Sequence, residues 1–243
     1  MSPLSISWIV FACVFGGGLL GMVLRNTLPE HHLNADSKSA LNLVIGLIGT
    51  MAAIVLGLLV ATAQSSFSTR NSEFIQMSAN VILADRMLGL YGPETKEARE
   101  LLQGAVTRWL QPSSSEGGTS KGGEALYKII QGLSPKNDAQ RWLQAQVLSM
   151  AFTLGQTRWL LFEQSGTSIP MAFLVVLVFW LSVIFASFGL FAPRNVTVVA
   201  ALFVGALSVS GAIFLILELD RPFQGLIHIS DAPLRNALAH LGQ

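Results

Sequence analysis

The chain has 243 residues, of which 51% are hydrophobic and only 12% are charged, and its formal net charge is +1. Soluble globular domains usually carry about 25% charged residues, so the composition excludes an ordinary soluble domain. The net charge near zero and the lack of a basic cluster in the sequence give no reason to expect nucleic acid as a partner.

Four stretches of the sequence contain no Asp, Glu, Lys or Arg and are long enough to cross a membrane. A helix rises about 1.5 Å per residue, so about 20 residues cross the roughly 30 Å hydrocarbon layer. A helix also satisfies its own backbone hydrogen bonds in lipid. The stretches contain 19, 23, 24 and 23 residues and are Ile6–Leu24, Leu41–Ala63, Ile169–Ala192 and Asn195–Leu217. The sequence therefore predicts an all-α, four-pass helical membrane protein. The lipid bilayer is accordingly expected to be one of its partners.

The first stretch is expected to be a retained span rather than a secretory signal. No basic residue precedes it and no small-x-small cleavage site follows it. Cys13, Gly17 and Gly21 recur in it every four residues. Small residues at this spacing let helices pack closely, and this face has no polar group to hold an ion, so we expect a packing face. Cys13 is the only cysteine, so no intrachain disulfide is expected.

The polar segment between the first two spans contains His31 and His32, with Glu30 and Asp36 nearby. Adjacent side chains of one loop rarely converge on an ion, so exposed loop histidines are the better interpretation. We therefore expect neither a metal site nor a cofactor.

The second stretch is the most informative, because its small and polar residues recur every three or four positions and so share a helix face. The candidate pore-lining residues are Asn42, Gly46, Gly49, Thr50, Ala53, Gly57, Ala61 and Gln64. Two interpretations remain open. Small residues at this spacing commonly mediate close helix packing, which the spacing alone favours. They also suit the lining of a water-filled pore, which the polar run Gln64–Ser66 favours.

Residues 65–168 form a polar segment that holds 19 of the 29 charged residues. Apolar residues repeat in it every seven positions, as in a helix that packs on other helices. These positions are Phe67, Phe74, Val81 and Leu88. The pattern leaves the second span without a Pro or Gly break, so a single helix is expected to run from the second span to Gly92.

The rest of the polar segment is predicted to contain a linker and a returning helix. Pro112–Gly123 is rich in Gly and Ser and is expected to be flexible. Ser134 and Pro135 are predicted to be the N-cap and the first residue of a long helix that returns to the membrane. The segment is thus expected to be an antiparallel helical hairpin with a smaller helical tip.

The distribution of basic residues predicts the orientation. Four spans place both termini and the segment 65–168 on one side of the membrane. That side carries twelve Lys and Arg residues, and the other side carries three. Basic residues concentrate in cytoplasmic loops, so both termini and the polar segment are predicted to be cytoplasmic.

The sequence LELDRPFQG, Leu217–Gly225, places Glu218, Asp220 and Arg221 together at the end of the fourth span. Pro222 disfavours helical geometry at the residue before it, so the helix is expected to end there. Two interpretations stand side by side. One is an ion pair at the membrane boundary, in which Arg221 offsets Glu218. The other is an acidic position at the cytoplasmic mouth that attracts or gates ions.

The tail that follows is amphipathic and is expected either to lie on the membrane surface or to pack on the polar segment. The predicted organisation is a first transmembrane hairpin, a helical cytoplasmic domain, a second transmembrane hairpin and this tail. Their boundaries are 1–64, 65–168, 169–219 and 220–243.

The sequence contains none of the common catalytic motifs. It has no G-x-S-x-G, no H-E-x-x-H, no P-loop and no pair of cysteines. We therefore expect no enzymatic activity and assign no catalytic residue.

Two sequence stretches together resemble a known family. GLIGTMAAIVLGLLVATAQSSF in the second span and LELDRPFQG after the fourth are similar to the bestrophin-like domain family of bacterial membrane proteins. That family has a distant similarity to bestrophin anion channels. The resemblance implies a homo-oligomer, pentameric as in bestrophins, in the bacterial inner (plasma) membrane. It also implies that the second span lines the pore and that a permeant ion is a partner.

The sequence departs from bestrophins in two features. It lacks the acidic run that forms their calcium clasp, and its second span has no Phe before Phe67 that could form an aromatic constriction. The leading hypothesis is a homo-oligomeric ion channel whose second span lines the pore. The alternative is a non-conducting membrane scaffold or signalling protein whose cytoplasmic helices bind a partner. A carrier is less well supported, because the spans hold no buried charged pair and no evident inverted repeat.

Overall fold

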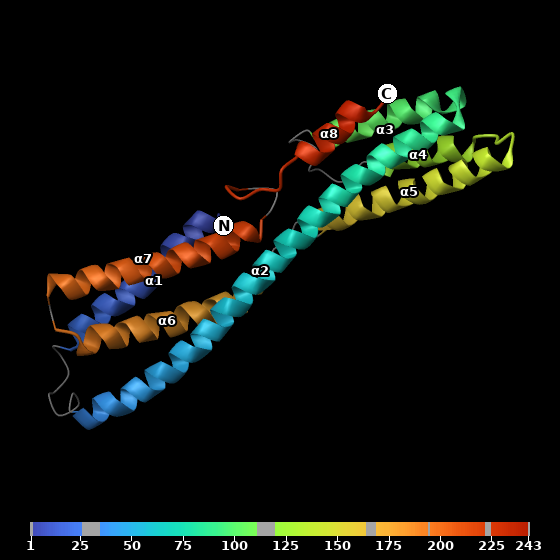
Figure 1. The fold of residues 1–243 in the computed structure, drawn as a ribbon. Helices are drawn as coiled ribbons and strands as arrows, with labels where there is room; N and C mark the ends of the chain where they lie inside the picture. The colour runs from blue at the N-terminus through green and yellow to red at the C-terminus, as the bar shows by residue number, and fades with distance from the viewer. Residues whose placement is uncertain are drawn as a thin grey trace. The chain divides into compact units, whose positions relative to one another are not determined.

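A computed structural model describes residues 2–25, 35–110, 120–163, 169–193, 195–221 and 225–242. All the regular structure of these residues is helical, which confirms the all-α prediction (Figure 1). The elements in sequence order are α1 (Pro3–Leu24), α2 (Ala35–Tyr91), the short 3₁₀ helix η2 (Pro93–Thr95), α3 (Lys96–Trp109), α4 (Ser120–Gln131), α5 (Asp138–Glu163), α6 (Met171–Phe191), α7 (Val196–Leu219) and α8 (Ala232–His240).

Four of these helices are long and apolar enough to cross a membrane, as predicted. They are α1, α2 from Leu41 onward, α6 and α7. The chain divides into two compact units. We call residues 1–67 and 167–227 the membrane unit, and residues 68–166 and 228–243 the helical unit. Helix α2 is continuous and contributes its first part to the membrane unit and its second part to the helical unit.

In the membrane unit, α1 packs closely against α6 through glycines (Figure 1). A Cβ atom at Gly17 would lie 2.8 Å from the carbonyl oxygen of Ser182. A Cβ at Gly21 would collide with the carbonyl of Ala186, and one at Gly189 would collide with that of Gly18. Backbones this close leave no room for a side chain. The packing face expected on the first span is therefore confirmed at Gly17 and Gly21, whereas Cys13, its third predicted member, is exposed.

The core of the membrane unit lies among α1, α6, α7 and one side of α2. It includes fully buried aliphatic side chains such as Val14, Leu177 and Ile213. Helix α2 adds Ala52, Leu59 and Ala63 to this core. The first span is also joined to the third at its end, where Nη1 of Arg25 donates a hydrogen bond of 2.5 Å to the carbonyl of Ala192.

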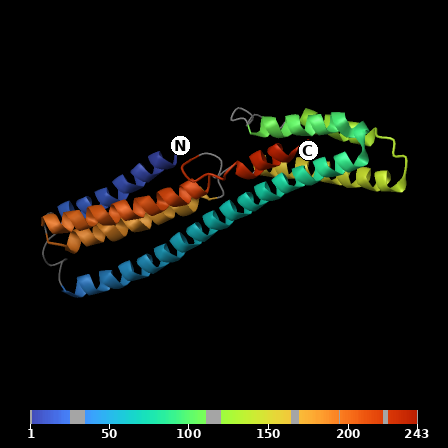
Figure 2. The ribbon, with the colours of Figure 1, turned by 45° about the horizontal axis from the view of Figure 1, so that its top comes forward.

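In the helical unit, the second part of α2 packs with α3, α4, α5 and α8 (Figure 2). The predicted heptad positions Val81 and Leu88 are almost fully buried, and Phe74 packs against the same core. Val147 and Leu154 of α5 complete it. Helix α2 ends at Tyr91, as Gly92 predicts, because Gly92 has a φ of 133° that ordinary side chains rarely adopt.

Two local predictions in the helical unit are wrong. Residues 120–123, expected to belong to a flexible linker, form the first turn of α4, whereas 111–119 lie outside the described residues. Helix α5 begins at Asp138 rather than at Pro135. The side chain of Asn137 accepts a hydrogen bond of 2.8 Å from the backbone N–H of Gln140, so Asn137 caps the helix in place of Ser134.

The C-terminal tail packs on the helices of the polar segment, which was one of its two predicted locations. Leu234, Ala237 and Leu241 are buried in the core of the helical unit. The backbone N–H of Gly242 donates a hydrogen bond of 3.1 Å to the carboxylate of Asp85. The same carboxylate accepts two hydrogen bonds from Arg99, of 2.7 and 2.8 Å.

Candidate functional site

The eight candidate pore-lining residues all lie in the first part of α2, and their own chain leaves them largely uncovered. Seven of the eight are exposed, and Gly49 is half-buried. A Cβ at Gly49 would only reach ordinary contact with Ile184, at 4.0 Å, and one at Gly46 or Gly57 would meet nothing within 4 Å. The surroundings differ from those of Gly17 and Gly21 on α1, where a Cβ would meet the backbone of α6 at close range. The described residues of the chain therefore do not pack closely on the small-residue face of α2.

The apolar part of α2 has three distinct faces, because successive residues turn by about 100° around a helix. Ala52, Leu59 and Ala63 form the face that is buried in the membrane unit. A second face carries large exposed side chains such as Ile54, which is 67% exposed, and Leu58. The small and polar candidates form the third face, between these two. A helix that only contacted lipid on its exposed sides would need no such third face.

The polar side chains on the small-residue face are uncharged. Asn42 and Gln64 are exposed near its two ends. Between them, the hydroxyl of Thr50 donates a hydrogen bond of 2.9 Å to the carbonyl of Gly46. That bond satisfies the hydroxyl proton and leaves the oxygen able to accept a bond from water. The face thus offers amide groups, a hydroxyl oxygen and bare backbone.

One residue on this face was missed by the sequence analysis. Val60 is 44% exposed and stands three positions after Gly57 and four before Gln64. It therefore shares their side of the helix. The spacing could have revealed it, but the selection of small and polar residue types excluded a valine. Val60 thus adds a branched apolar side chain to a face whose other candidate residues are small or polar.

The charged residues at the end of the fourth span form a local backbone contact. Glu218 lies in the last turn of α7 and is only 4% exposed. Its carboxylate accepts a hydrogen bond from the backbone N–H of Leu226. Gly225 has a φ of 150°, and a Cβ there would collide with that carboxylate. The carboxylate therefore fixes the backbone that follows α7. The buried Asp220 is the C-cap of α7, so the helix ends close to the predicted position at Arg221.

The described residues contain no group of three or more His, Cys, Asp or Glu side chains that could hold a metal ion. His31 and His32, considered as a metal site above, lie outside the described residues, and so does Pro222. The candidate residues on the α2 face are small, or polar and uncharged. The chemistry of this face is that of a surface for solvated ions or for another helix.

The sequence also matches a family model, described as a bestrophin-like domain, over residues 12–234. The chain belongs to the bestrophin-like family. The resemblance read from the second span and from LELDRPFQG is thereby confirmed. None of the curated proteins matches the sequence.

The bestrophin-like fold is also found in a solved structure. A bacterial bestrophin homolog from Klebsiella pneumoniae, crystallised as a mutant, superposes with a TM-score of 0.57. The two sequences are 17% identical, and the match covers 97% of this chain and 98% of that chain. At this identity the likeness shows the shared fold. It extends over the membrane unit and the helical unit alike, so both units belong to the bestrophin-like architecture.

Proposed function

We propose that this bestrophin-like protein is a homo-oligomeric ion channel in which α2 of each subunit lines a central pore. The observation that carries the proposal is the small-residue face of α2, which stays uncovered while the neighbouring face is buried in the core. Membership of the bestrophin-like family and the shared fold support a channel-like function. A pentamer is the subunit number that the resemblance implies.

The physical argument rests on the difference between the two exposed faces of α2. Large apolar side chains such as Leu47 and Ile54 suit contact with lipid tails. Glycines and the amides of Asn42 and Gln64 suit water, because they leave space and expose backbone dipoles and hydrogen-bonding groups. When several copies of α2 surround an axis, the second kind of face turns inward. Val60 then narrows the path with an apolar side chain, the kind of constriction that opens and closes by wetting.

The remaining parts of the proposal concern placement. The excess of basic residues beyond the second span supports a cytoplasmic helical unit and cytoplasmic termini in the inner membrane. An ion-attracting role for Glu218 requires the carboxylate to turn toward solvent, away from Leu226, with which it is paired. We assign no enzymatic activity.

Three consecutive residues provide a sharp test of the proposal. Gly57 belongs to the small-residue face, Leu58 is 58% exposed on the large apolar face, and Leu59 is 4% exposed in the core. Each is changed to Cys in a Cys13→Ser background, and currents are recorded from the purified protein in planar bilayers. A small charged thiol reagent added in water should react with the Gly57→Cys protein and block its current. The Leu58→Cys and Leu59→Cys proteins should react at least tenfold more slowly.

A silent wild-type protein, together with an unreactive Gly57→Cys variant, would contradict the channel. That pair of results is what the scaffold or signalling alternative predicts, because its α2 faces would be sealed by neighbouring helices. A reactive Gly57→Cys variant without current would indicate a water-filled but closed path. Repeating the recording with Val60→Ala would then test whether the apolar narrowing holds it closed.

A further inference from the structure

From Trp142 to Thr157, helix α5 carries an exposed face without charge, although the helix belongs to the polar segment and begins with the exposed Asp138. No Asp, Glu, Lys or Arg occurs from Trp142 to Thr157. Trp142 is 61% exposed and Phe152 is 69% exposed. Between them, the small residues Ala145 and Ser149 are exposed on the same side, so two large side chains flank two small ones. Aromatic side chains without neighbouring charges are typical of the centres of protein interfaces.

A second apolar stripe runs along the part of α2 that belongs to the helical unit. Ile75, Leu83 and Leu90 are 47%, 44% and 76% exposed. They are separated by eight and seven residues, so they lie on one side of the helix. Val81 and Leu88, on the opposite side, are buried in the core. This part of α2 therefore has a second side with exposed large apolar side chains, interrupted by the exposed Arg86, whereas the described residues cover only the side of Val81 and Leu88.

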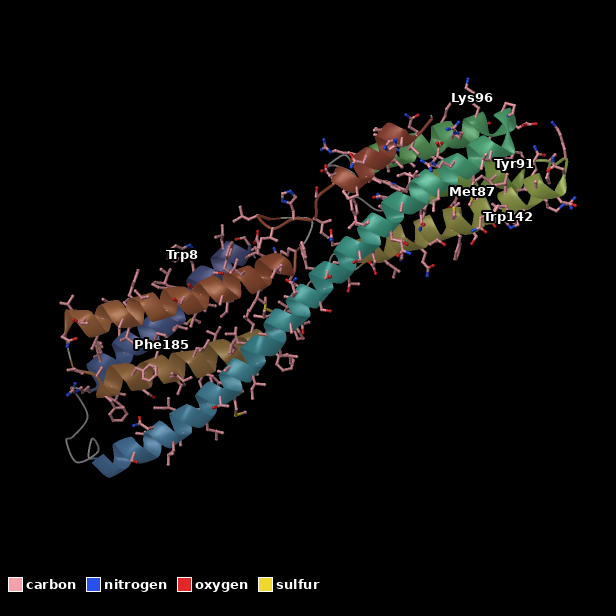
Figure 3. All side chains as sticks on the ribbon, in the orientation of Figure 1. Trp8, Met87, Tyr91, Lys96, Trp142 and Phe185 are labelled. Carbon is pink, nitrogen blue, oxygen red and sulfur yellow. The ribbon has the colours of Figure 1, made fainter. Side chains whose placement is uncertain are left out.

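The two stripes present large side chains at matching levels along the hairpin. Helices α2 and α5 run side by side in this unit (Figures 1 and 2), and the side chain of Gln140 donates a hydrogen bond to the carbonyl of Tyr91. Leu90 and Trp142 lie within two residues of that bond, and Figure 3 shows Tyr91 and Trp142 at the same end of the unit. Phe152 is twelve residues from Gln140 along α5, a level between those of Leu83 and Ile75 on α2.

We infer that the α2 stripe of one copy packs against the uncharged face of α5 in the next copy. This contact rests on the proposed self-association and extends it from the membrane to the helical unit. Subunits related by rotation about an axis along the helices meet at equal height, so a second copy of this chain is the partner that matches both stripes. An interface made of two different faces closes into a ring when each subunit carries both.

The exposed apolar area is adequate for such an interface. A large apolar side chain contributes about 150–250 Å² when fully exposed. Scaled by their exposed fractions, the five large side chains of the two stripes amount to roughly 600 Å². A specific interface buries about 1,600 Å² in total, and rather more than half of this is apolar. The two stripes thus supply roughly two thirds of the apolar surface of one subunit contact.

Cysteine pairs placed on separate chains test the contact. In a Cys13→Ser background, chains with Leu83→Cys and chains with Ser149→Cys carry different tags and are expressed together. Leu83 is eight residues from Tyr91, and Ser149 is nine from Gln140, so the two lie at one level. The matched control pairs Leu90→Cys with Ser149→Cys, which are offset by about eight residues, or about 12 Å along the helices. Disulfides are formed with copper phenanthroline and detected with both tags.

We expect the Leu83–Ser149 product to exceed the Leu90–Ser149 product at least fivefold. The further substitution Phe152→Asp should abolish the Leu83–Ser149 product, because it places a charge in the contact. Equal yields from both pairs, or no Leu83–Ser149 product from an assembly that light scattering shows to be oligomeric, would overturn the inference. An oligomer that conducts without this product leaves the channel standing and removes the contact. A Leu83–Ser149 product from an oligomer that carries no current supports the contact and contradicts the channel. A monomeric protein contradicts both the contact and the channel.

Discussion

The carboxylate of Asp85 joins three segments of the helical unit that are distant in sequence. It lies on α2, well beyond the apolar span, and its side chain is 3% exposed. It binds Arg99 of α3 through two hydrogen bonds and the backbone of Gly242 through a third. Burial by itself raises the pKa of this carboxyl, but the hydrogen bonds from Arg99 and Gly242 and the charge of Arg99 outweigh it, so the net pKa lies below its ordinary value.

The lowered pKa of Asp85 gives the helical unit a defined dependence on pH. The folded state favours the ionised carboxylate, so its stabilising contribution is fully present above the unfolded pKa of about 3.9 and is lost as the pH falls through the lower folded value. We expect the tail, residues 232–242, to lose protection from hydrogen exchange below about pH 4. Asp85→Asn should remove about 2 kcal/mol from the free energy of unfolding at pH 7 and expose the tail there.

Asp138→Asn is the matched control for that substitution. Asp138 forms an ion pair with Arg141, but both side chains are exposed, so its loss should change little. Tail amides of the Asp85→Asn protein that exchange as slowly as those of the wild type at pH 7 would show that the buried carboxylate does not hold the tail.

Individual residues were predictable from the sequence where a single physical rule decided them. Gly92 ends α2 because its backbone conformation suits glycine. Ser134 was assigned as a cap because its type is right, but Asn137 is equally suitable and Gln140 holds the preceding turn through hydrogen bonds to Lys136 and Tyr91. That choice depends on tertiary contacts, which spacing along the chain does not contain. Val60 shows the reverse case. Its position on the helix places it on the small-residue face, but a selection by small and polar residue types leaves it out.

Two glycine-bearing helices of the membrane unit have opposite surroundings. On α1, Gly17 and Gly21 meet the backbone of α6, and on α2, Gly46 and Gly57 meet nothing within 4 Å. The sequence patterns are almost identical, since both repeat small residues every three or four positions. Spacing therefore predicts that each helix has a face of small residues. It does not predict what occupies the space beside that face, because this depends on how the other helices are arranged.

The close contact between α1 and α6 makes a specific prediction about stability. Gly21→Ala places a methyl group against the carbonyl of Ala186, so the helices must separate. We expect it to reduce the free energy of unfolding by about 1–3 kcal/mol, as overpacking does in closely packed cores. Gly16→Ala is the matched control, because a Cβ there meets nothing within 4 Å and alanine favours the helix. It should be neutral or stabilising.

Thermal unfolding of both variants in detergent measures the difference. A Gly21→Ala protein that is as stable as Gly16→Ala would mean that α1 and α6 do not pack as closely as their glycines allow.

The assembly of subunits brings the remaining features into one account. The small-residue face of α2 and the two stripes of the helical unit are among the surfaces that the described residues of one chain leave uncovered. In the proposed ring of subunits, the stripes would be covered and the small-residue faces of α2 would turn toward a common axis. The four spans and the polar helical segment could be predicted from hydropathy and heptads, because these patterns record burial within the chain. In the proposed assembly, the uncovered surfaces are covered by neighbouring copies, and patterns within one chain do not identify such partners.

An image of the intact oligomer along the membrane normal, at a resolution that separates helices, decides between the two accounts of α2. The channel account predicts that α2 forms the innermost ring, with Asn42, Gly57 and Gln64 along one continuous solvent path and Val60 at a narrow point. The channel account would be contradicted by a map in which protein or lipid covers the small-residue face of α2 and no open path lies at the symmetry axis.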